Sequence, residues 1–302
     1  MAATVNVNGV MFDQDRAVIS VFDHGFLFGE GIYETMRTYN ARPFLFGRHM
    51  RRLRTSASMI DLSIPLSDDE MARRVAATLD AAGLDAARSA TASHVGTHDE
   101  AYILILVTRG VGDLTYDPAA TPVASIVIIV KPHVPLAEEV YRNGVTVSLV
   151  PIMRNHPGSV NPLIKSNNLL NNALAAQAAI RRGAFEGVMR NYRGELAECT
   201  TSNLFVVKDG EVLTPPLQAG LLAGITRELV FELGPWTCVA VREAVLKDDD
   251  LFAADEAFLT SSTREVLPIV KVDDRRIGTG QPGPVTRRLL EAYRAAATTD
   301  VH

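Results

Sequence analysis

One lysine stands out because nothing charged lies near it in the sequence. Lys165 occurs in the stretch NPLIKSNNLL (161–170), between an apolar pair and a row of amides. An amine acts as a nucleophile only when it is unprotonated part of the time, so it needs desolvation or a cationic neighbour to lower its pKa. Apolar residues that could supply dry surroundings flank it: Leu163, Ile164, Leu169 and Leu170. A lysine extending into solvent from the start of a helix would look the same, so the lysine alone favours that structural interpretation.

A glutamate 33 residues further on changes this balance. Glu198 lies in ELAECTTSNLF, in a Thr/Ser/Asn-rich loop that we expect between two strands. A buried carboxylate needs a cationic or N–H partner. A protonated pyridine nitrogen is such a partner, and holding that proton makes pyridoxal phosphate a good electron sink.

Such a cofactor also requires a site for its phosphate. The stretch GITREL (224–229), at the start of an expected helix, offers backbone N–H groups, the helix dipole and the Thr226 hydroxyl. Residues 260–263 add hydroxyls, and Arg52 could add a charge-assisted contact. An N-cap, a turn and a surface arginine would explain each of these singly. Together with the lysine and the glutamate, they favour a cofactor site.

Hydrophobic periodicity, capping residues and turns predict the elements that must position these groups. Strands are expected at 5–10, 17–22, 32–40, 101–110, 123–132, 145–150, 237–242 and 256–260, with hairpins at 187–198 and 203–216. Helices are expected at 49–62, at 67–82 after an N-cap Ser67, at 166–182, from 224 to just before Gly234, and at 284–297. Strands and helices mix without strict βαβ alternation, which argues for two α+β domains.

The length of 302 residues fits one large domain or two of medium size. Two prolines and a glycine surround a short polar piece in KPHVPLAEEVYRNG, which we interpret as an interdomain linker. We therefore expect an N-terminal α/β domain at 1–132, a linker at 133–144 and a C-terminal cofactor-binding domain at 145–302.

Composition excludes several classes of protein. Apolar residues make up 47% and charged residues 22%, as in globular proteins, and a net charge of -5 gives no reason to expect nucleic acid or membrane as partner. The apolar runs are too short to cross a bilayer and no secretory signal is visible. Cys199 and Cys238 lack ligand or redox spacing, which favours a cytoplasmic protein. His94 and His98 have a metal-like separation, but their Ser/Thr/Gly-rich surroundings favour a solvated loop, and we expect no metal.

At the level of motifs, the chain resembles the class IV, fold-type IV pyridoxal-phosphate aminotransferases. The resemblance covers nearly the whole chain in the expected order, through FDHGFLFGEGIYETMRTYN, HMRRLRTSA, VTRGVGD, IKSNNLLNNALAA, GELAECTTSNLFVVKDG, LLAGITRELV and LTSSTREVLPI. It implies a two-domain fold of the D-amino-acid aminotransferase type, with pyridoxal 5′-phosphate in the interdomain cleft. It also implies a homodimer or a higher homo-oligomer.

The resemblance also assigns roles, residue by residue. Lys165 matches the Schiff-base and proton-transfer lysine, and Glu198 matches the carboxylate that faces the pyridine nitrogen. The residues that match phosphate contacts are Arg52, Ile225, Thr226, Ser262 and Thr263. Arg54, close to Arg52, is given a structural role. The residues that align with segments lining the substrate pocket are Tyr33, Arg37, Tyr102 and Arg109, and Arg37 is the candidate for a substrate carboxylate contact.

The implied activity is a ping-pong transamination between an amino donor and a 2-oxo acid. We expect a branched-chain L-amino acid as donor and 2-oxoglutarate as acceptor. The alternatives are a D-amino-acid or (R)-amine transaminase, and a 4-amino-4-deoxychorismate lyase. Substrate recognition stays open because the chain departs from both transaminase patterns. Leu104 replaces an arginine of the branched-chain enzymes, and Leu114 and Tyr116 replace an arginine and a histidine of the D-amino-acid enzymes.

Overall fold

The computed structural model describes residues 3–84 and 100–299, so His94 and His98 lie outside the described residues. The chain divides into two compact units. The first unit comprises the chain up to Pro135 together with Ile164–Asn168, and the second comprises Leu136–Leu163 and the residues from Leu169 onward. The stretch 164–168, which the sequence placed with the C-terminal domain, therefore packs with the first unit.

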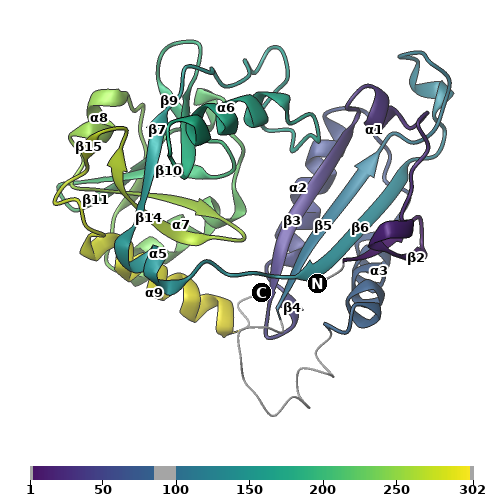
Figure 1. Cartoon of the computed structure of the whole chain (residues 1–302), viewed down its shortest axis with the longest axis horizontal. Helices are drawn as coiled ribbons and strands as arrows, with labels where there is room; N and C mark the ends of the chain where they lie inside the picture. Colours follow the sequence, from purple (N-terminus) through teal and green to yellow (C-terminus); the bar gives the residue numbers. More distant parts are fainter. Residues whose placement is uncertain (1–2, 85–99, 300–302) are drawn as a thin grey trace. The chain divides into compact units, whose positions relative to one another are not determined.

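An antiparallel sheet of six strands forms the first unit (Figure 1). Its order is β2 (Val10–Asp13), β1 (Thr4–Val7), β6 (Ser125–Pro132), β5 (Ala101–Thr108), β3 (Gly31–Tyr39) and β4 (Arg42–Pro43). Alternate residues of β3, β5 and β6 pack with the helices α2 (Phe46–Ser58) and α3 (Asp68–Ala81) in one hydrophobic core. Because side chains alternate across a strand, the residues between them point to the opposite face of the sheet.

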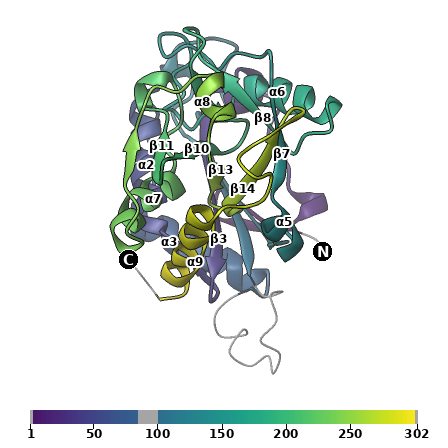
Figure 2. The same ribbon diagram turned by 90° about the vertical axis from the view of Figure 1, so that its left-hand side faces the viewer.

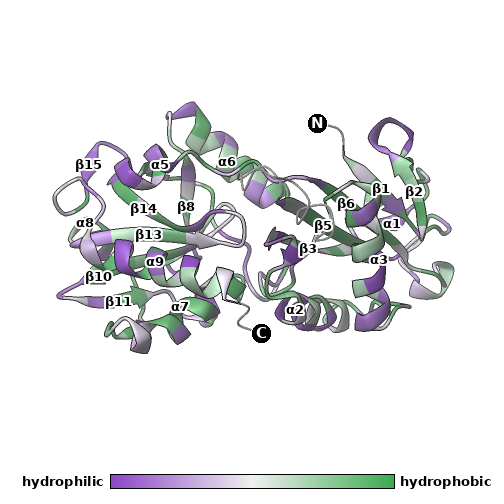
Figure 3. Cartoon of the chain, turned by 90° about the horizontal axis from the view of Figure 1, so that it is seen from below, coloured by the Kyte–Doolittle hydropathy of each residue, from purple (hydrophilic) through white to green (hydrophobic). Residues whose placement is uncertain are grey.

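The helices of the first unit follow their local signals. Ser67 caps α3 in a capping box with Glu70, as expected from the sequence. Met50, Leu53 and Ala57 of α2 are buried, whereas the helix ends at Ser58, four residues before the expected end. Figure 3 shows hydrophobic and hydrophilic residues mixed along α2, as an amphipathic helix requires.

The strand expected at 17–22 is absent, and this prediction was wrong. The segment leads into the short helix α1 (His24–Leu27), which Asp23 caps by accepting a hydrogen bond from the Gly25 N–H. Val18 and Val21 are 75% and 63% exposed. β-branched residues alone do not make a strand where no neighbouring strand offers hydrogen-bond partners.

The second unit is built on a mixed sheet of nine strands. Its order is β12 (Val241–Glu243), β11 (Glu211–Thr214), β10 (Asn203–Lys208), β13 (Glu256–Ser261), β14 (Glu265–Val272), β7 (Val145–Leu149), β8 (Glu186–Arg190) and β9 (Leu196–Cys199), with β15 (Arg275–Arg276) beside β14. Both expected hairpins, β8–β9 and β10–β11, form. The sequence missed β14, which pairs with β13 on one edge and β7 on the other and so lies centrally (Figure 2).

Five α-helices of the described residues accompany this sheet: α5 (Glu138–Asn143), α6 (Leu170–Arg181), α7 (Ile225–Trp236), α8 (Asp248–Phe252) and α9 (Pro284–Thr298). Short 3₁₀ helices occur in both units, at Gln14–Arg16, Pro118–Ala120 and Leu217–Ala219. None of the helices in the described parts of the chain is long and apolar enough to span a membrane.

Helices of the second unit also differ from expectation, and α6 begins at Leu170, four residues after the expected start. The expected linker contains α5, whose Tyr141 is buried and donates a hydrogen bond to the Arg264 carbonyl in the same unit. Gly234 does not stop α7 but lies within it, where an added Cβ would come within 2.8 Å of the Val239 carbonyl oxygen. A glycine can mark close packing as well as a helix end.

Candidate functional site

Lys165 is held in the first unit by backbone contacts with β3 and α2. Its carbonyl accepts from the Tyr33 N–H at 2.9 Å, and its own N–H donates to Ser56 Oγ at 3.1 Å. The Nζ lies 4.4 Å from the centre of the Tyr33 ring. An aromatic face attracts an ammonium group, so the tyrosine helps to fix the position of this amine.

The surroundings of Lys165 differ from those expected. Ile164 packs against the core of the first unit, but Leu169 and Leu170 are 40% and 67% exposed. The two leucines therefore do not shield the amine in this structure. Next to it, the Asn167 backbone N–H donates to the Gly31 carbonyl at 3.0 Å, and the Asn167 side-chain Nδ2 lies 3.5 Å from the Gly25 carbonyl oxygen.

A buried ionic cluster joins β3 to α2. The Glu34 carboxylate accepts from Arg52 Nε and Nη2 at 2.7 and 2.8 Å, and His49 Nδ1 lies 2.6 Å from it. Burial alone would raise the pKa of Glu34, but Arg52 and His49 outweigh this and hold that pKa well below its usual range. Burial lowers the pKa of His49, and the carboxylate offsets only part of that effect. The cluster fixes Arg52, the expected phosphate arginine.

Arg54 is fixed by different partners. Its guanidinium donates to Asp68 Oδ1 at 2.8 and 3.0 Å and to backbone carbonyls at Ile64 and Leu66. These contacts tie the end of α2 to the segment that leads into α3, which is a structural role.

Three of the four expected substrate residues share one face of the sheet. Tyr33 and Arg37 lie four residues apart on β3, and Arg37 pairs directly with Tyr102 on β5. Arg109 lies apart from them. Its Nη atoms donate to the carbonyls of Ile60 and Asp61 at 2.6 and 3.2 Å. Because these donors hold the turn that follows α2, the contacts of Arg109 favour a positioning function over a direct substrate contact.

The buried His133, near Arg37, should make the protein less stable in acid. Burial, together with the charge of Arg37, lowers the pKa of His133 to about 4. The unfolded chain, with a histidine pKa near 6.5, therefore binds the proton first, and stability falls as the pH drops from about 6.5 toward 4. We expect His133→Phe to remove about 2 kcal/mol of this loss, after allowance for partial hydration. Urea unfolding at pH 4.5, 5.5 and 7 would measure it; equal pH slopes in both proteins would contradict it.

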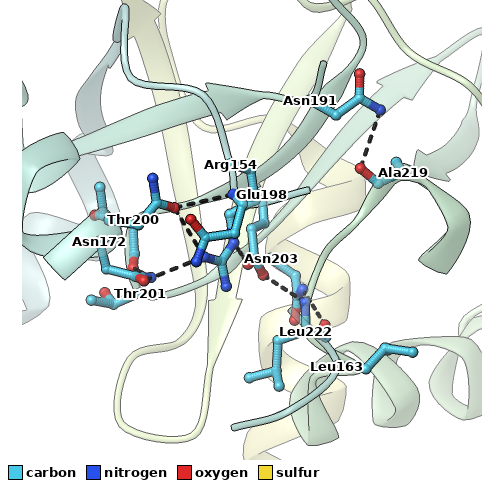
Figure 4. Close-up of polar contacts among 12 residues, drawn as sticks. Arg154, Leu163, Asn172, Asn191, Glu198, Thr200, Thr201, Asn203, Ala219 and Leu222 are labelled. Atoms are coloured by element: carbon cyan, nitrogen blue, oxygen red, sulfur yellow. Dashed lines mark hydrogen bonds and ion pairs between the residues drawn. The ribbon is translucent and has the colours of Figure 1, made fainter. Parts of the chain in front are cut away.

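Glu198 lies in β9 and not in a loop, which corrects the expectation, and it belongs to the second unit. It is 5% exposed. Its Oε1 accepts from Arg154 Nε at 2.6 Å and its Oε2 accepts from the Leu222 N–H at 3.0 Å (Figure 4). A charge-assisted contact and a backbone donor thus fix both carboxylate oxygens.

Arg154 is the main residue that sequence reasoning missed. Its Nη1 donates to Asn171 Oδ1 at 3.0 Å and lies 3.4 Å from Asn172 Oδ1, both at the start of α6. Asn172 in turn donates to the Thr200 carbonyl. The signal was present as an arginine in a polar loop followed by paired asparagines, but 44 residues separate Arg154 from Glu198. The amides that follow Lys165 in sequence therefore orient the partner of Glu198.

The expected phosphate residues of the second unit lie at a helix start and a tight turn. Gly224 precedes α7 without a side-chain cap, and Ile225 and Thr226 are 4% and 3% exposed. The first N–H groups of a helix lack intrahelical acceptors and attract anions. Ser262 and Thr263 lie in the turn between β13 and β14.

Two buried hydroxyl groups just before this turn also suit a phosphate ligand. Within the described residues, Thr260 Oγ1 and Ser261 Oγ are buried without a hydrogen-bond partner. Buried hydroxyls normally have partners. These orphaned donors, close in sequence to Ser262, are compatible with a phosphate as the missing acceptor.

Comparisons with known proteins agree with this chemistry. The family model "Amino-transferase class IV" matches residues 31–272. A putative branched-chain-amino-acid aminotransferase of Methanocaldococcus jannaschii is 35% identical over 97% of this chain and 96% of its own length. A D-alanine aminotransferase of Listeria monocytogenes is 32% identical over 96% and 94%.

Solved structures give the same result for the fold. A branched-chain amino acid aminotransferase from T.th., solved with pyridoxamine 5′-phosphate, has a TM-score of 0.89 at 28% identity and covers 99% of this chain and 95% of its own. The branched-chain enzyme of Escherichia coli has a TM-score of 0.87 at 27% identity, covering 100% and 96%.

The two sheets and their helices are those of fold type IV. The chain belongs to the class IV aminotransferases. It is an aminotransferase, and its cofactor is pyridoxal 5′-phosphate.

Proposed function

We propose that the chain transfers the amino group of a branched-chain L-amino acid to 2-oxoglutarate. The observation that carries the choice of donor is an apolar row beside Tyr33, the tyrosine that contacts Lys165. Leu106 pairs directly with Tyr33, and Leu104 pairs with Thr35, on the same sheet face. Such a surface suits an aliphatic side chain. The branched-chain relatives support the choice, whereas the D-alanine relatives keep a D-amino acid as the second candidate.

Each site residue has a proposed role in this reaction. When bound, pyridoxal phosphate supplies the aldehyde that receives the amino group and the ring that accepts electrons. Lys165 would hold the cofactor through this aldehyde, and once the substrate's amino group had replaced it there, the released amine would move the proton at the substrate's α-carbon. Glu198, kept in place by Arg154, holds the proton on the pyridine nitrogen. The residues proposed to bind the phosphate are Arg52, Ile225, Thr226, Ser262 and Thr263.

Substrate residues are proposed on the same basis. We assign Arg37 to the substrate carboxylate, with Tyr33 and Tyr102 lining the same sheet face. The exposed Leu114 and Tyr116 follow Arg109 in the sequence, and they offer no charge for a carboxylate.

A half-reaction panel should separate the substrate classes. Holoenzyme is mixed with L-leucine, L-valine, D-alanine, D-glutamate or (R)-phenylethylamine, and the visible absorbance of the lysine-linked cofactor is followed. We expect L-leucine and L-valine to bleach it, with 2-oxoglutarate restoring it. Bleaching by the D-amino acids or the amine alone would contradict this donor. Pyruvate release from 4-amino-4-deoxychorismate without an acceptor would instead identify the lyase.

We also propose that the enzyme is a cytoplasmic homodimer or larger homo-oligomer. Exposed apolar side chains gather in sequence around α1 and after β5, as expected of a surface that a second copy covers. They include Val18, Val21, Phe22, Phe26, Val111 and Leu114. Sedimentation would measure the assembly, and a monomer at micromolar concentration would contradict it. Both cysteines are free thiols, as is usual in the cytoplasm.

A further inference from the structure

One asparagine connects the two groups of the second unit that are proposed to hold the cofactor. Asn203 Nδ2 donates to the Leu222 carbonyl at 2.9 Å, and the N–H of the same Leu222 donates to Glu198 Oε2 at 3.0 Å (Figure 4). Leu222 therefore lies between the asparagine and the carboxylate. A shift of Asn203 would move the backbone donor on which Glu198 depends.

The same side chain also contacts the start of α7. A Cβ added to Gly224 would lie 1.8 Å from Asn203 Oδ1, a distance at which no side chain fits. Gly224 is the N-cap residue of α7, so the amide packs directly against the backbone that presents Ile225 and Thr226. One end of the Asn203 amide thus serves Glu198, and the other end limits the position of the helix start.

Asn203 is itself fixed. It is the first residue of β10, it is 5% exposed, and its backbone pairs with Thr260 of β13. Thr260 and Ser261 lead directly into the turn with Ser262 and Thr263. Asn203 therefore contacts the Leu222 backbone that holds the carboxylate, the helix start, and the strand that leads to the hydroxyl turn.

We propose that Asn203 is a positioning residue that sets the spacing between the Glu198 carboxylate and the phosphate-binding start of α7. The inference rests on the proposed roles of Glu198 and α7. A cofactor bound at both its ring nitrogen and its phosphate binds tightly only when the distance between the two binding groups matches its length. Once the first contact has formed, the second then forms at high effective concentration. If the spacing changes, the two contacts can no longer form together. The gain in affinity that the phosphate gives should then fall, even where the ring contact and the phosphate contact are each still present.

The test compares two ligands on apoprotein: pyridoxal 5′-phosphate and pyridoxal, which lacks the phosphate. Both carry the same aldehyde, so the bond to Lys165 cancels in the ratio of their dissociation constants. In Asn203→Ala we expect this ratio, the gain due to the phosphate, to fall about tenfold or more. General damage to the fold would weaken both ligands equally and leave the ratio unchanged.

Asn191 provides a matched control. It is a buried amide that donates to the Ala219 carbonyl at 3.1 Å, three residues before Leu222 in the same segment (Figure 4). Its other side-chain hydrogen bonds are with Glu195 and with the backbone N–H groups of Arg193 and Glu195. We expect Asn191→Ala to keep the phosphate gain within about twofold of the wild type.

A double-mutant cycle tests the contact with Gly224. Gly224→Ala alone should reduce the phosphate gain, because its Cβ collides with Asn203 Oδ1. In an Asn203→Ala background the collision is removed, so the same substitution should cost little more, and the two losses should not add. Additive losses would overturn the proposal.

Two further variants separate the failure of this inference from that of the proposed site. Glu198→Gln and Thr226→Val should each weaken binding of pyridoxal 5′-phosphate. If neither does, the proposed roles fail. If both do, and Asn203→Ala keeps the same phosphate gain as Asn191→Ala, only the positioning role of Asn203 is overturned.

Discussion

Lys165→Ala is expected to abolish the visible absorbance of bound pyridoxal phosphate and to reduce transamination by at least about 10⁴-fold. The variant loses both the amine that bonds to the aldehyde and the base that moves the proton. The loss should not come from unfolding, because the contacts that hold this segment use the backbone of Lys165: its carbonyl accepts from Tyr33 and its N–H donates to Ser56. Absorbance spectra and single-turnover kinetics of purified protein would measure the effect.

Lys131→Ala is the control for this substitution. Lys131 belongs to the same unit and also lies over a tyrosine, with Nζ 5.0 Å from the centre of the Tyr102 ring. Its removal deletes the same kind of cation–π contact, which contributes about 0.5–1 kcal/mol at an exposed site. It removes no group proposed to bond the cofactor, but Tyr102 is a proposed substrate residue, so the comparison uses the visible band alone. A normal visible band in Lys165→Ala, or its loss in Lys131→Ala, would contradict the assignment.

The elements set by local signals were predictable from the sequence. Ser67 caps α3 as expected, and the hairpin expected at 203–216 forms from β10 and β11. Errors arose where a distant partner decides the structure. The segment at 17–22 has strand-like composition but no neighbouring strand to pair with. The strand β14 lies between β13, which directly precedes it, and β7, which is far away in the sequence.

The same division applies to the candidate site. Lys165 and Glu198 could be selected only in combination, because a lysine, a carboxylate and a phosphate-binding set in one chain fit a single cofactor, whereas each alone has a structural explanation. Arg154 could not, because its value lies in a contact with Glu198 that the sequence spacing does not reveal. Nor could the sequence show that Arg109 donates to backbone carbonyls in the turn after α2.

Removing Arg154 should cause the largest loss of stability among the proposed site variants. Its side chain and that of Glu198 are 9% and 6% exposed, with Nε 2.6 Å from Oε1. Arg154→Met takes away the charged partner of a buried carboxylate and leaves it the backbone N–H of Leu222, which costs about 3–5 kcal/mol. Urea unfolding of the apoprotein would measure this change in the free energy of unfolding.

A surface pair in the same unit shows what an exposed ion pair is worth. Arg190 donates to both carboxylate oxygens of Asp248 at 2.8 and 2.6 Å, but their side chains are 29% and 35% exposed. Arg190→Met should therefore cost only about 1 kcal/mol. Equal losses in the two arginine variants would show that burial does not decide the cost.

The double variant Arg154→Met/Glu198→Gln separates stability from chemistry. It removes both charges, so no unpaired carboxylate remains, and most of the lost stability should return because neutral replacements of a buried pair are often tolerated. Activity should not return, since a neutral amide cannot hold the proton on the pyridine nitrogen as a carboxylate does. A stable but inactive double variant would show that the buried pair is maintained for catalysis at little benefit to the fold. Recovery of both properties would contradict the role assigned to Glu198, and recovery of neither would mean that the arginine supports the fold through its contacts with Asn171 and Asn172 instead.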